Sequence, residues 1–395
     1  MTQGTMETDI AARLKNLKTR LSDMGVDGAL ILDKVSLYYL TGTDQDAHLW
    51  VPVQGQPLLM VRKSLARAEK DALVAPLLPL PSLSHLAPLI QDHTGGIPGR
   101  IGLEMDILPA LFYEKYRKLF PRSRFIDISP AVRLIRMRKS PVEQSHIRKA
   151  AAVADRLFEK VPDFLRESKT ETDLALRAEA FYRSQGHPGL VRTRAFNSEC
   201  HYGHIMAGKG AAEASNAPGP TGGRGLGPFF SQGAGSHKIG KNESIVVDYA
   251  ASVSGYIADQ TRIYVLGTLP EKFHRAYRVM VEVQDTIAEK GRPGVRAKDL
   301  YHLALDIVEK NGLTKGFMGY PDPVPFVGHG LGLEIDEWPV IGNNNGIRLE
   351  EGMALALEPK VVFPGEGVVG IENTFIVTQN GLERLCRFPD DIVSC

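Results

Sequence analysis

Two apolar hairpins each carry a pair of acidic residues, and these pairs constrain the fold more than any other feature of the sequence. The first hairpin covers 245–266 and begins Ile-Val-Val-Asp-Tyr-Ala. A tight turn centred on Val253 and Ser254 would place Asp248 directly opposite Asp259, on one face of the hairpin. Like charges on directly opposed residues are destabilising. We therefore expect a cation between these two carboxylates.

The second hairpin repeats this arrangement with glutamates. Its strands, 354–362 and 368–377, flank a turn centred on Gly365, which would place Glu358 opposite Glu372. Each acid taken alone could face solvent at a strand edge, but burying an unpaired carboxylate is costly, so two such pairs together favour a cation site. We expect bound metal, rather than lysine or arginine, to neutralise the four acids.

His329 is a further candidate ligand. Glycines flank it in Gly328-His329-Gly330 and leave space around the imidazole, although a lone histidine is more often structural. Two aspartates, two glutamates and one histidine suit a pair of divalent ions such as Mn²⁺, Co²⁺ or Zn²⁺. Two ions about 3.5–4 Å apart would polarise a carbonyl and lower the pKa of a shared water. The implied chemistry is hydrolysis.

The order of the predicted elements indicates two domains. Helical and strand patterns alternate over the first 135 or so residues, which is typical of an α/β domain. Ser140-Pro141-Val142-Glu143 is a strong helix start, with a capping serine, a proline at the first helical position and a glutamate three residues on. We therefore place the domains at 1–138 and 139–395. In the second domain, two helices precede each hairpin, at 141–166 and 172–185 and then at 271–290 and 297–310.

Within the first domain, hydrophobic periodicity predicts three helices and four short strands. The helices are expected at 10–24, 65–74 and 110–120, and the strands at 29–32, 50–53, 57–61 and 101–104. The proline- and leucine-rich segment 76–88 is expected to contain little regular structure. The whole chain is therefore predicted to have an α+β fold with an internal duplication in its second domain.

Charge and composition exclude several classes of partner. The chain has 47 Lys+Arg against 46 Asp+Glu, without long runs of one sign, so neither nucleic acid nor an anionic membrane is expected. The three cysteines, Cys200, Cys386 and Cys395, are widely spaced and fit a reducing, cytoplasmic location. We expect neither a signal peptide nor a membrane span.

Several motifs resemble the pita-bread metallopeptidases, a superfamily that includes Xaa-Pro aminopeptidase, prolidase, methionine aminopeptidase and creatinase. They are the eleven-residue spacing of Asp248 and Asp259, Asp-x-Thr-Arg at 259–262, Gly-His-Gly-x-Gly-x-Glu at 328–334, Glu358-Pro359, and Glu372-Asn373-Thr374. Gly-Ala-Leu-Ile at 28–31 and Tyr-Leu-Thr-Gly at 39–42 resemble the creatinase/prolidase N-terminal domain. The resemblance implies this N-terminal domain followed by a pita-bread catalytic domain.

The resemblance also implies a role for each of the five candidate ligands. Asp248 would bind one ion, His329 and Glu358 would bind the other, and Asp259 and Glu372 would bridge both. Glu358 and His329 would be the catalytic residues, with Glu358 as proton shuttle for a bridging hydroxide that attacks the scissile carbonyl. The ions would be Mn²⁺ or Co²⁺, with Zn²⁺ as a further option, and the protein would be a homodimer.

Two departures from the family pattern concern the substrate. The family's peptidases usually carry a second histidine in a His-Glu-x-Pro string, where this chain has Asp336-Glu337-Trp338-Pro339; a further upstream histidine is replaced by a loop rich in glycine and proline. Asp336 could contact a substrate amine, and His201 or His204 could fill the place of the upstream histidine. Arg262 is another candidate, with packing in the hairpin as the alternative. We expect an intact hydrolytic centre in a rebuilt pocket.

Three functions follow from these residues. The first is a dinuclear Xaa-Pro aminopeptidase or dipeptidase that cleaves an N-terminal Xaa-Pro or similar peptide bond. The second is a creatinase-like hydrolase of a non-peptide C–N bond in a small molecule, since one fold can host several chemistries. The third is a metal-free binding or scaffold protein. A peptide or a small molecule is the expected substrate in the first two cases.

Overall fold

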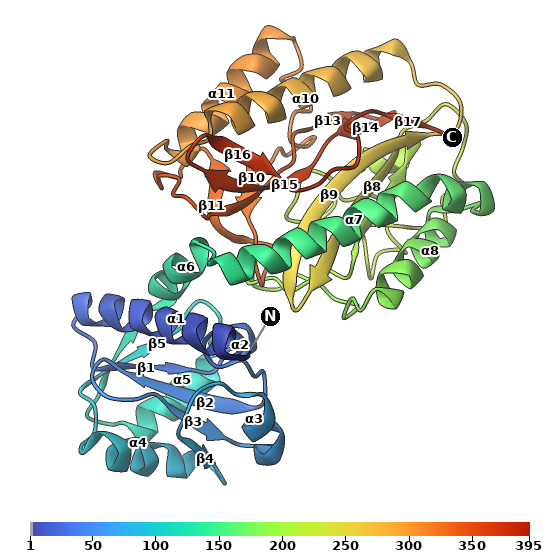
Figure 1. Cartoon of the computed structure of the whole chain (residues 1–395). Helices are drawn as coiled ribbons and strands as arrows, with labels where there is room; N and C mark the ends of the chain where they lie inside the picture. The colour runs from blue at the N-terminus through green and yellow to red at the C-terminus, as the bar shows by residue number, and fades with distance from the viewer. Residues whose placement is uncertain (1–2) are drawn as a thin grey trace. The chain divides into compact units, whose positions relative to one another are not determined.

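The computed structural model describes residues 3–395 and contains two compact units, Met1–Arg136 and Met137–Cys395. The first unit is built on one six-stranded sheet with the order β4-β3-β2-β1-β5-β6 (Figure 1). Its strands are β1 (Gly28–Ile31), β2 (Ala47–Pro52), β3 (Leu58–Val61), β4 (Leu77–Pro79), β5 (Arg100–Leu103) and β6 (Arg124–Asp127). The strand β1 pairs antiparallel with β2 and parallel with β5, so the sheet is mixed.

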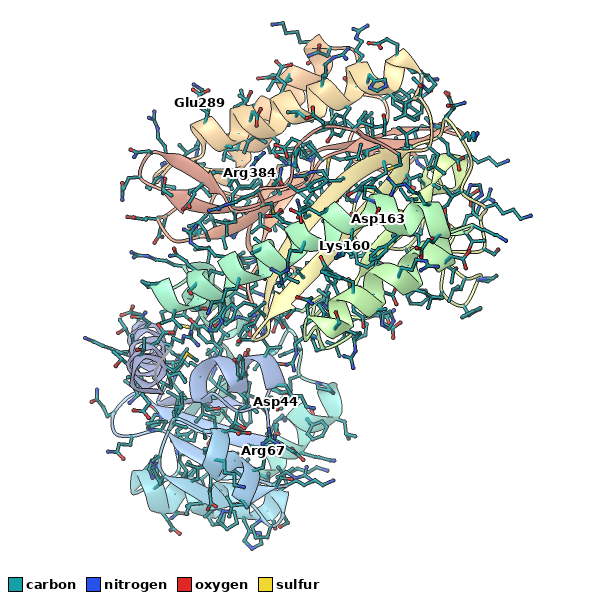
Figure 2. The ribbon with its side chains drawn as sticks, turned by 45° about the vertical axis from the view of Figure 1, so that its right-hand side comes forward. Asp44, Arg67, Lys160, Asp163, Glu289 and Arg384 are labelled. Atoms are coloured by element: carbon teal, nitrogen blue, oxygen red, sulfur yellow. The ribbon has the colours of Figure 1, made fainter. Side chains whose placement is uncertain are left out.

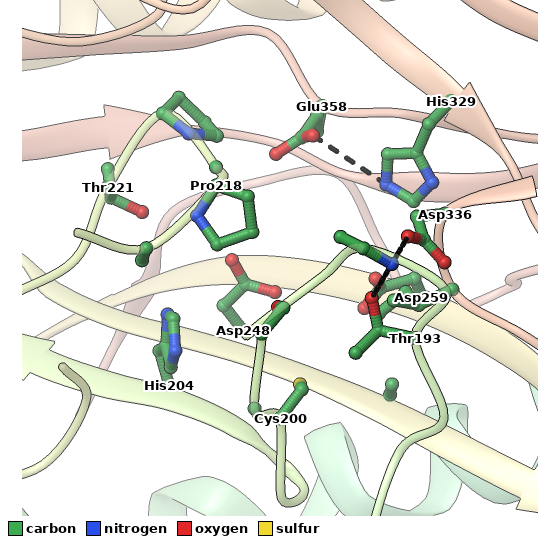
Figure 3. A pocket seen from close by; sticks show the side chains of 18 of the residues that line it. Thr193, Cys200, His204, Pro218, Thr221, Asp248, Asp259, His329, Asp336 and Glu358 are labelled. Carbon is green, nitrogen blue, oxygen red and sulfur yellow. Dashed lines mark hydrogen bonds and ion pairs between the residues drawn. The ribbon is translucent and has the colours of Figure 1, made fainter. Parts of the chain in front are cut away.

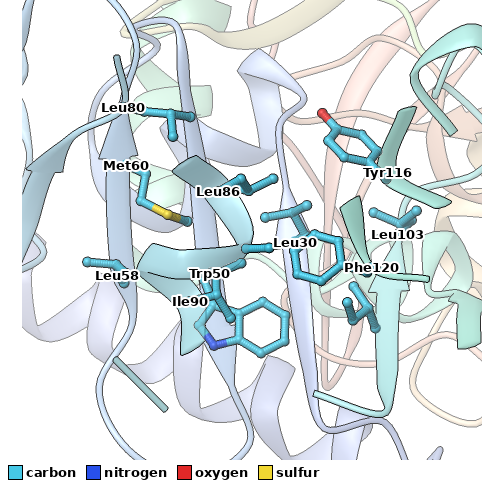
Figure 4. Close-up of a cluster of buried hydrophobic side chains, with 12 residues drawn as sticks. Leu30, Trp50, Leu58, Met60, Leu80, Leu86, Ile90, Leu103, Tyr116 and Phe120 are labelled. Carbon is cyan, nitrogen blue, oxygen red and sulfur yellow. The ribbon is translucent and has the colours of Figure 1, made fainter. Parts of the chain in front are cut away.

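The helices of this unit supply the other half of its core. They are α1 (Gln3–Asp23), α2 (Lys34–Thr41), α3 (Leu65–Asp71), the 3₁₀ turn η1 (Leu83–His85), α4 (Leu86–Thr94), α5 (Ala110–Leu119) and α6 (Ser129–Met137). Figure 4 shows how Leu30 and Trp50 of the sheet gather with Ile90 of α4 and Tyr116 of α5 in one buried cluster. Burial of such large apolar side chains is the main force that holds sheet and helices together.

The expected helices and strands of the first unit are present, but several further elements were missed. Segment 76–88 contains β4, η1 and the start of α4, although we expected little regular structure there. Its strand exists because β3 supplies a parallel partner, a long-range pairing that local composition does not reveal. The helix α2 was missed although Asp33 caps it by accepting hydrogen bonds from the amides of Val35 and Ser36.

The second unit contains the helix–helix–hairpin order twice. Its first half comprises α7 (Pro141–Glu167), α8 (Glu171–Ser184), β7 (Gly203–Ala207), α9 (Gly208–Ala211), β8 (Ile245–Val253) and β9 (Tyr256–Val265). Its second half comprises α10 (Glu271–Lys290), α11 (Ala297–Lys310), β10 (Phe326–Gly330), β11 (Glu337–Gly342), β12 (Ala354–Leu357), β13 (Lys360–Phe363), β14 (Gly367–Gly370), β15 (Asn373–Thr378), β16 (Gly381–Arg384) and β17 (Val393–Ser394). The predicted capping box at Ser140 and Glu143 begins α7.

Each half packs a helix pair against its own sheet. The helix α7 runs along β8 and β9, while α10 and α11 cover the strands of the second half (Figure 1 and Figure 2). The sheets have the orders β17-β9-β8-β7 and β11-β10-β12-β15-β16, and β13 and β14 form a separate two-stranded ribbon. The predicted α+β fold with a duplicated second domain is confirmed. No helix among residues 3–395 has both the length and the apolar character needed to cross a membrane.

The register of the first hairpin differs from the prediction by two residues. The turn residues are Ser254 and Gly255, both with positive φ (54° and 81°), so Asp248 pairs with Thr261 instead of Asp259. Two central residues with positive φ are typical of the tight turns that match strand twist. Because the shift is an even number of residues, Asp248 and Asp259 still share one face, as diagonal neighbours.

The register of the second hairpin is as predicted. Leu357 pairs with Asn373 and Lys360 with Gly370, and this common register places Glu358 in line with Glu372. The ladder is interrupted at these two glutamates, so the hairpin belongs partly to the five-stranded sheet and partly to the β13–β14 ribbon.

Candidate metal centre

The four acids and the histidine come from two hairpins and one additional strand, and the fold brings them to one place. Asp248 lies on β8, Asp259 on β9 and His329 on β10, while Glu358 follows β12 and Glu372 precedes β15. The two sheets are tied together beside the centre because the amide of Thr261 donates to the carbonyl of Glu372 (3.2 Å) and the amide of Glu372 donates back (3.3 Å). Figure 3 shows Asp248, Asp259, His329 and Glu358 around the cavity, and Glu372 also lines it.

Asp259, His329 and Glu372 form the tightest group of candidate ligands. One ligand atom from each lies within 4.8 Å of the other two. The Nδ1 of His329 lies 3.1 Å from the carbonyl oxygen of Gly330, which can only accept, so a neutral imidazole donates there and keeps its lone pair on Nε2. That Nε2 faces Glu358 Oε1 at 3.6 Å and Glu372 Oε1 at 3.9 Å.

Glu372 carries the clearest sign that a cation belongs here. Its Oε2 accepts hydrogen bonds from Thr261 Oγ1 (2.8 Å) and Lys360 Nζ (3.0 Å), but among the described residues its buried Oε1 has no hydrogen-bond partner. Burial raises the pKa of this carboxyl to about 7. A buried carboxylate oxygen without a partner is costly, so this oxygen fits a divalent cation.

The charged form of Asp259 is also disfavoured by its surroundings. It is 5% exposed, and burial raises its pKa well above the usual value, with further contributions from the charges of Glu372 and Asp248. Its backbone is fixed by Thr374, whose hydroxyl accepts from the amide of Asp259 and donates to its carbonyl (2.8 and 2.9 Å). The Asp259–His329–Glu372 group therefore fits the divalent ion that the sequence predicts.

Lys360 is a central residue of the site that the sequence analysis missed. Its Nζ donates to Glu358 Oε2 (2.8 Å), Asp248 Oδ2 (3.0 Å) and Glu372 Oε2 (3.0 Å), and its side chain is 1% exposed. Burial by itself lowers the pKa of this lysine, but the three carboxylates together raise it well above its usual value. We expected bound metal, rather than lysine or arginine, to neutralise the four acids; the structure adds Lys360 as an ion-pair partner of three of them.

A signal for this lysine was present in the sequence. Lys360 stands two residues after Glu358 in an otherwise apolar strand, and strand residues two apart share a face. The same register that aligns the two glutamates places Lys360 opposite Gly370. A charged residue opposite a glycine, on the face of two glutamates, marks a lysine that points into the site.

A cavity of about 250 Å³ opens beside the centre (Figure 3). All five candidate ligands line it, and so do Asp336 and His204, two of the three residues proposed for substrate binding. Asp336 also holds the loop at 193–195, because it accepts hydrogen bonds from Thr193 Oγ1 (2.9 Å) and from the amides of Arg194 and Ala195 (both 2.8 Å). This carboxylate therefore shapes the cavity wall.

The two candidate replacements for the upstream histidine occupy different places. His204 lies on β7 directly beside Asp248 of β8 and lines the cavity. Burial lowers its pKa, so it is a neutral imidazole near pH 7. His201 is exposed, packs against Phe230 and does not line this cavity.

Arg262 lies outside the cavity, in the packed interior of the hairpin. It forms an ion pair with Asp390 (2.7 Å) and donates to the carbonyls of Glu372, Phe388 and Pro389. Its guanidinium thereby fixes the backbone at Glu372 without facing the substrate side. Of the two alternatives for this residue, the structure gives it the packing position.

Cys200 also lines the cavity, which raises the question of a thiol nucleophile. Burial and the nearby charges of Asp259 and Asp248 raise the pKa of this thiol to about 12. Because the thiolate is the reactive form, a thiol with such a pKa is inert near neutrality. The chemistry of the cavity therefore resides in the carboxylates, the imidazole and the lysine.

Comparison with known proteins matches the two units to two family models. Residues 145–379 match metallopeptidase family M24, and residues 13–138 match the creatinase/prolidase N-terminal domain. The chain is 26% identical over 384 residues to an Xaa-Pro dipeptidase of Pyrococcus furiosus. The alignment covers 96% of this chain and 99% of that protein.

Solved structures show the same fold along the whole chain. The prolidase of Pyrococcus horikoshii superposes with a TM-score of 0.81 at 24% identity, covering 97% of this chain and all of that one. The dipeptidase PepE of Mycobacterium ulcerans gives a TM-score of 0.80 at 25% identity, with 98% of each chain covered. The two-part architecture is therefore shared with these proteins from end to end.

Proposed function

Because the chain belongs to metallopeptidase family M24, we propose that it is an Xaa-Pro peptidase, which cleaves an N-terminal Xaa-Pro or similar peptide bond. The observation that carries this proposal is the group of Asp259, His329 and Glu372 at the edge of the cavity, with a buried oxygen of Glu372 that has no hydrogen-bond partner among the described residues. The relatives named Xaa-Pro dipeptidase and prolidase support the substrate class.

The residues of the centre divide the work of hydrolysis. Asp259, His329 and Glu372 would hold a divalent ion, which supplies Lewis acidity toward a carbonyl and lowers the pKa of water. Glu358 would accept a proton from the attacking water and pass it to the leaving nitrogen; the distance of 3.6 Å between its Oε1 and His329 Nε2 supports this role. Lys360 holds the other oxygen of Glu358 and thereby fixes its orientation.

The metal ion is proposed to be Mn²⁺ or Co²⁺, with Zn²⁺ as a further option. Carboxylate ligands with a single imidazole suit these hard and borderline ions, whereas thiolate-dependent metals lack ligands here. Lys360 also occupies part of the centre, where its ammonium group donates to Asp248, Glu358 and Glu372.

The cavity favours a short substrate. Its volume of about 250 Å³ lies below the roughly 300–1,000 Å³ of drug-sized ligand sites. His204 and Asp336 line it in place of the family's usual histidines, so the preferred residue before proline is proposed to differ from that of typical prolidases. We further propose a homodimer in the cytoplasm; the latter fits the three cysteines, none of which forms a disulfide.

The proposed function is tested with a panel of substrates offered to protein loaded with Mn²⁺ or Co²⁺. The panel contains Xaa-Pro dipeptides, longer peptides that begin Xaa-Pro, matched Xaa-Ala peptides, and creatine. We expect turnover of Xaa-Pro dipeptides above all others. Turnover of creatine without peptide hydrolysis would support the second function, a hydrolase of non-peptide C–N bonds, and would overturn the first.

A further inference from the structure

We propose that the ammonium group of Lys360 takes the place of one of two divalent ions, so that the centre holds a single ion between Asp259, His329 and Glu372. This inference rests on the proposed metal-dependent function and changes its metal count. In the two-ion centre that the family resemblance implies, Asp248 would bind one ion and Glu358 the other, and Lys360 donates hydrogen bonds to both residues.

The hydrogen bonds of Lys360 occupy the atoms on which a second ion would depend. Its Nζ lies 3.0 Å from Asp248 Oδ2 and 2.8 Å from Glu358 Oε2. Its Nζ also donates to Glu372 Oε2 (3.0 Å), whereas the other oxygen of Glu372, Oε1, remains available to an ion between Asp259 and His329. The carboxylate of Glu372 thus lies between one fixed cation, the lysine, and one open position.

The pairing of β13 with β14 directs Lys360 towards the carboxylates of the centre. Lys360 pairs directly with Gly370, and a Cβ added to Gly370 would lie only 2.4 Å from Cγ of Lys360. The absence of a side chain at residue 370 therefore makes room for the aliphatic stem. The aliphatic stem of Lys360 is enclosed in this way, and its side chain is 1% exposed. Packing therefore fixes the position of its ammonium group.

Electrostatic repulsion disfavours a lysine ammonium and a second metal ion beside the same carboxylates. An ammonium and a divalent cation repel each other strongly inside a protein, and both compete for the same carboxylate lone pairs. A lysine on Asp248 and Glu358 therefore disfavours a second ion there. The remaining position, with a histidine nitrogen and two carboxylates, has the three protein ligands typical of catalytic single-metal sites.

The test counts ions in the intact chain, so it has a readout besides activity. Full-length protein is saturated with Mn²⁺, freed of excess metal, and examined by native mass spectrometry and by electron paramagnetic resonance. We expect one Mn²⁺ per chain and the six-line signal of an isolated ion. Two ions per chain with a spin-coupled signal would overturn the proposal, and so would the absence of any bound ion.

Two variants of Lys360 separate the effect of charge from that of shape. Lys360→Met keeps a similar stem without the charge, and we expect its Mn²⁺ occupancy to rise from one to two ions per chain. Lys360→Arg keeps the charge and serves as the matched control, with one ion expected. Circular dichroism reports whether each variant is folded; a folded Lys360→Met protein that still binds one ion would contradict the proposal.

The outcomes also distinguish this inference from the proposed function. A wild-type chain with one ion but no Xaa-Pro hydrolysis would leave the metal count standing and remove the function. A chain with two ions that cleaves Xaa-Pro dipeptides would do the opposite.

Discussion

Glu372 contacts Lys360, the candidate metal position and Arg262. One of its oxygens accepts from Thr261 and Lys360, and the other faces His329 and lacks a hydrogen-bond partner among the described residues. Its backbone carbonyl accepts from Arg262. The side chain is therefore held in one orientation before any ion arrives, which is the preorganisation that metal sites require.

Glu372→Gln is expected to weaken Mn²⁺ binding by at least about 100-fold, because changes even to outer-shell partners cost 10–100-fold. The variant keeps the size of the side chain but removes the charge. Isothermal titration calorimetry measures the affinity. Glu366→Gln, in the exposed turn of the same hairpin, is the control and should bind like the wild type; equal affinities in both variants would contradict the assignment of Glu372.

Asp336→Ala is expected to raise KM for Xaa-Pro dipeptides at least about tenfold, with a smaller effect on kcat. The change removes the acceptor of three hydrogen bonds that hold the cavity wall at 193–195, and a tenfold effect corresponds to only about 1.4 kcal/mol. Steady-state kinetics gives both constants. If kcat falls while KM is unchanged, Asp336 acts in the chemical step and not in shaping the wall.

Of the side chains in the site, the acidic residues were predictable from the sequence and their environment was not. Asp248, Asp259, Glu358 and Glu372 could be found because acids in apolar strands are conspicuous and share a face by strand periodicity. Lys360 was missed because a lysine two residues beyond an acid suggests an ordinary surface pair. Only its position opposite Gly370 reveals that it points inward.

Arg262 connects three elements, since it lies on β9 and bonds to the residues before β15 and to the segment 388–390. Its side chain is fully buried, burial lowers its pKa, and the surrounding carbonyls and the Asp390 carboxylate accept its hydrogen bonds. This arginine therefore fastens the C-terminal segment to the hairpins that carry the ligands.

Arg262→Met is expected to lower the free energy of unfolding of the second unit by about 3–5 kcal/mol, because it leaves the Asp390 carboxylate and several carbonyls without their donor. The control is Arg148→Met, which removes an exposed bidentate pair with Glu383 and should cost less than about 1 kcal/mol. Urea denaturation followed by circular dichroism compares the two. Similar losses of unfolding free energy in both variants would show that Arg262 stabilises the second unit no more than an exposed ion pair does.

The elements that could be predicted are those whose pattern is local. The boundaries of α10 and α11 follow from amphipathic periodicity, and the hairpins follow from apolar runs around turn residues. The register of the first hairpin was missed by two residues because Ser254 and Gly255, and not Val253 and Ser254, adopt positive φ. The strand β4 was missed because it depends on a distant partner.

Acid is expected to destabilise both units, since each buries a histidine. Burial lowers the pKa of His48 in the first unit and of His187 in the second to about 4. The unfolded chain binds these protons near pH 6.5, so the contribution of the two histidines to folding stability is constant above that pH and falls as pH decreases from 6.5 towards 4. The loss at pH 5 is about 1–2 kcal/mol for each histidine.

His48→Gln should remove most of this pH dependence from the first unit. Trp50 lies in the core of that unit and reports its unfolding by fluorescence in a Trp338→Phe background. The measurement compares urea unfolding at pH 7.5 and pH 5.0, with and without the substitution. A slope that is the same in both proteins would show that His48 is protonated in the folded state.

Hydrolysis by this family M24 chain is proposed to require metal at the Asp259–His329–Glu372 group. The most direct test measures initial rates of Xaa-Pro dipeptide hydrolysis by protein stripped with a chelator, before and after Mn²⁺ is restored. We predict no measurable rate in the stripped protein, full recovery with Mn²⁺, and no recovery in Asp259→Asn. Hydrolysis that persists in the stripped protein at the rate of the reloaded enzyme would contradict the account.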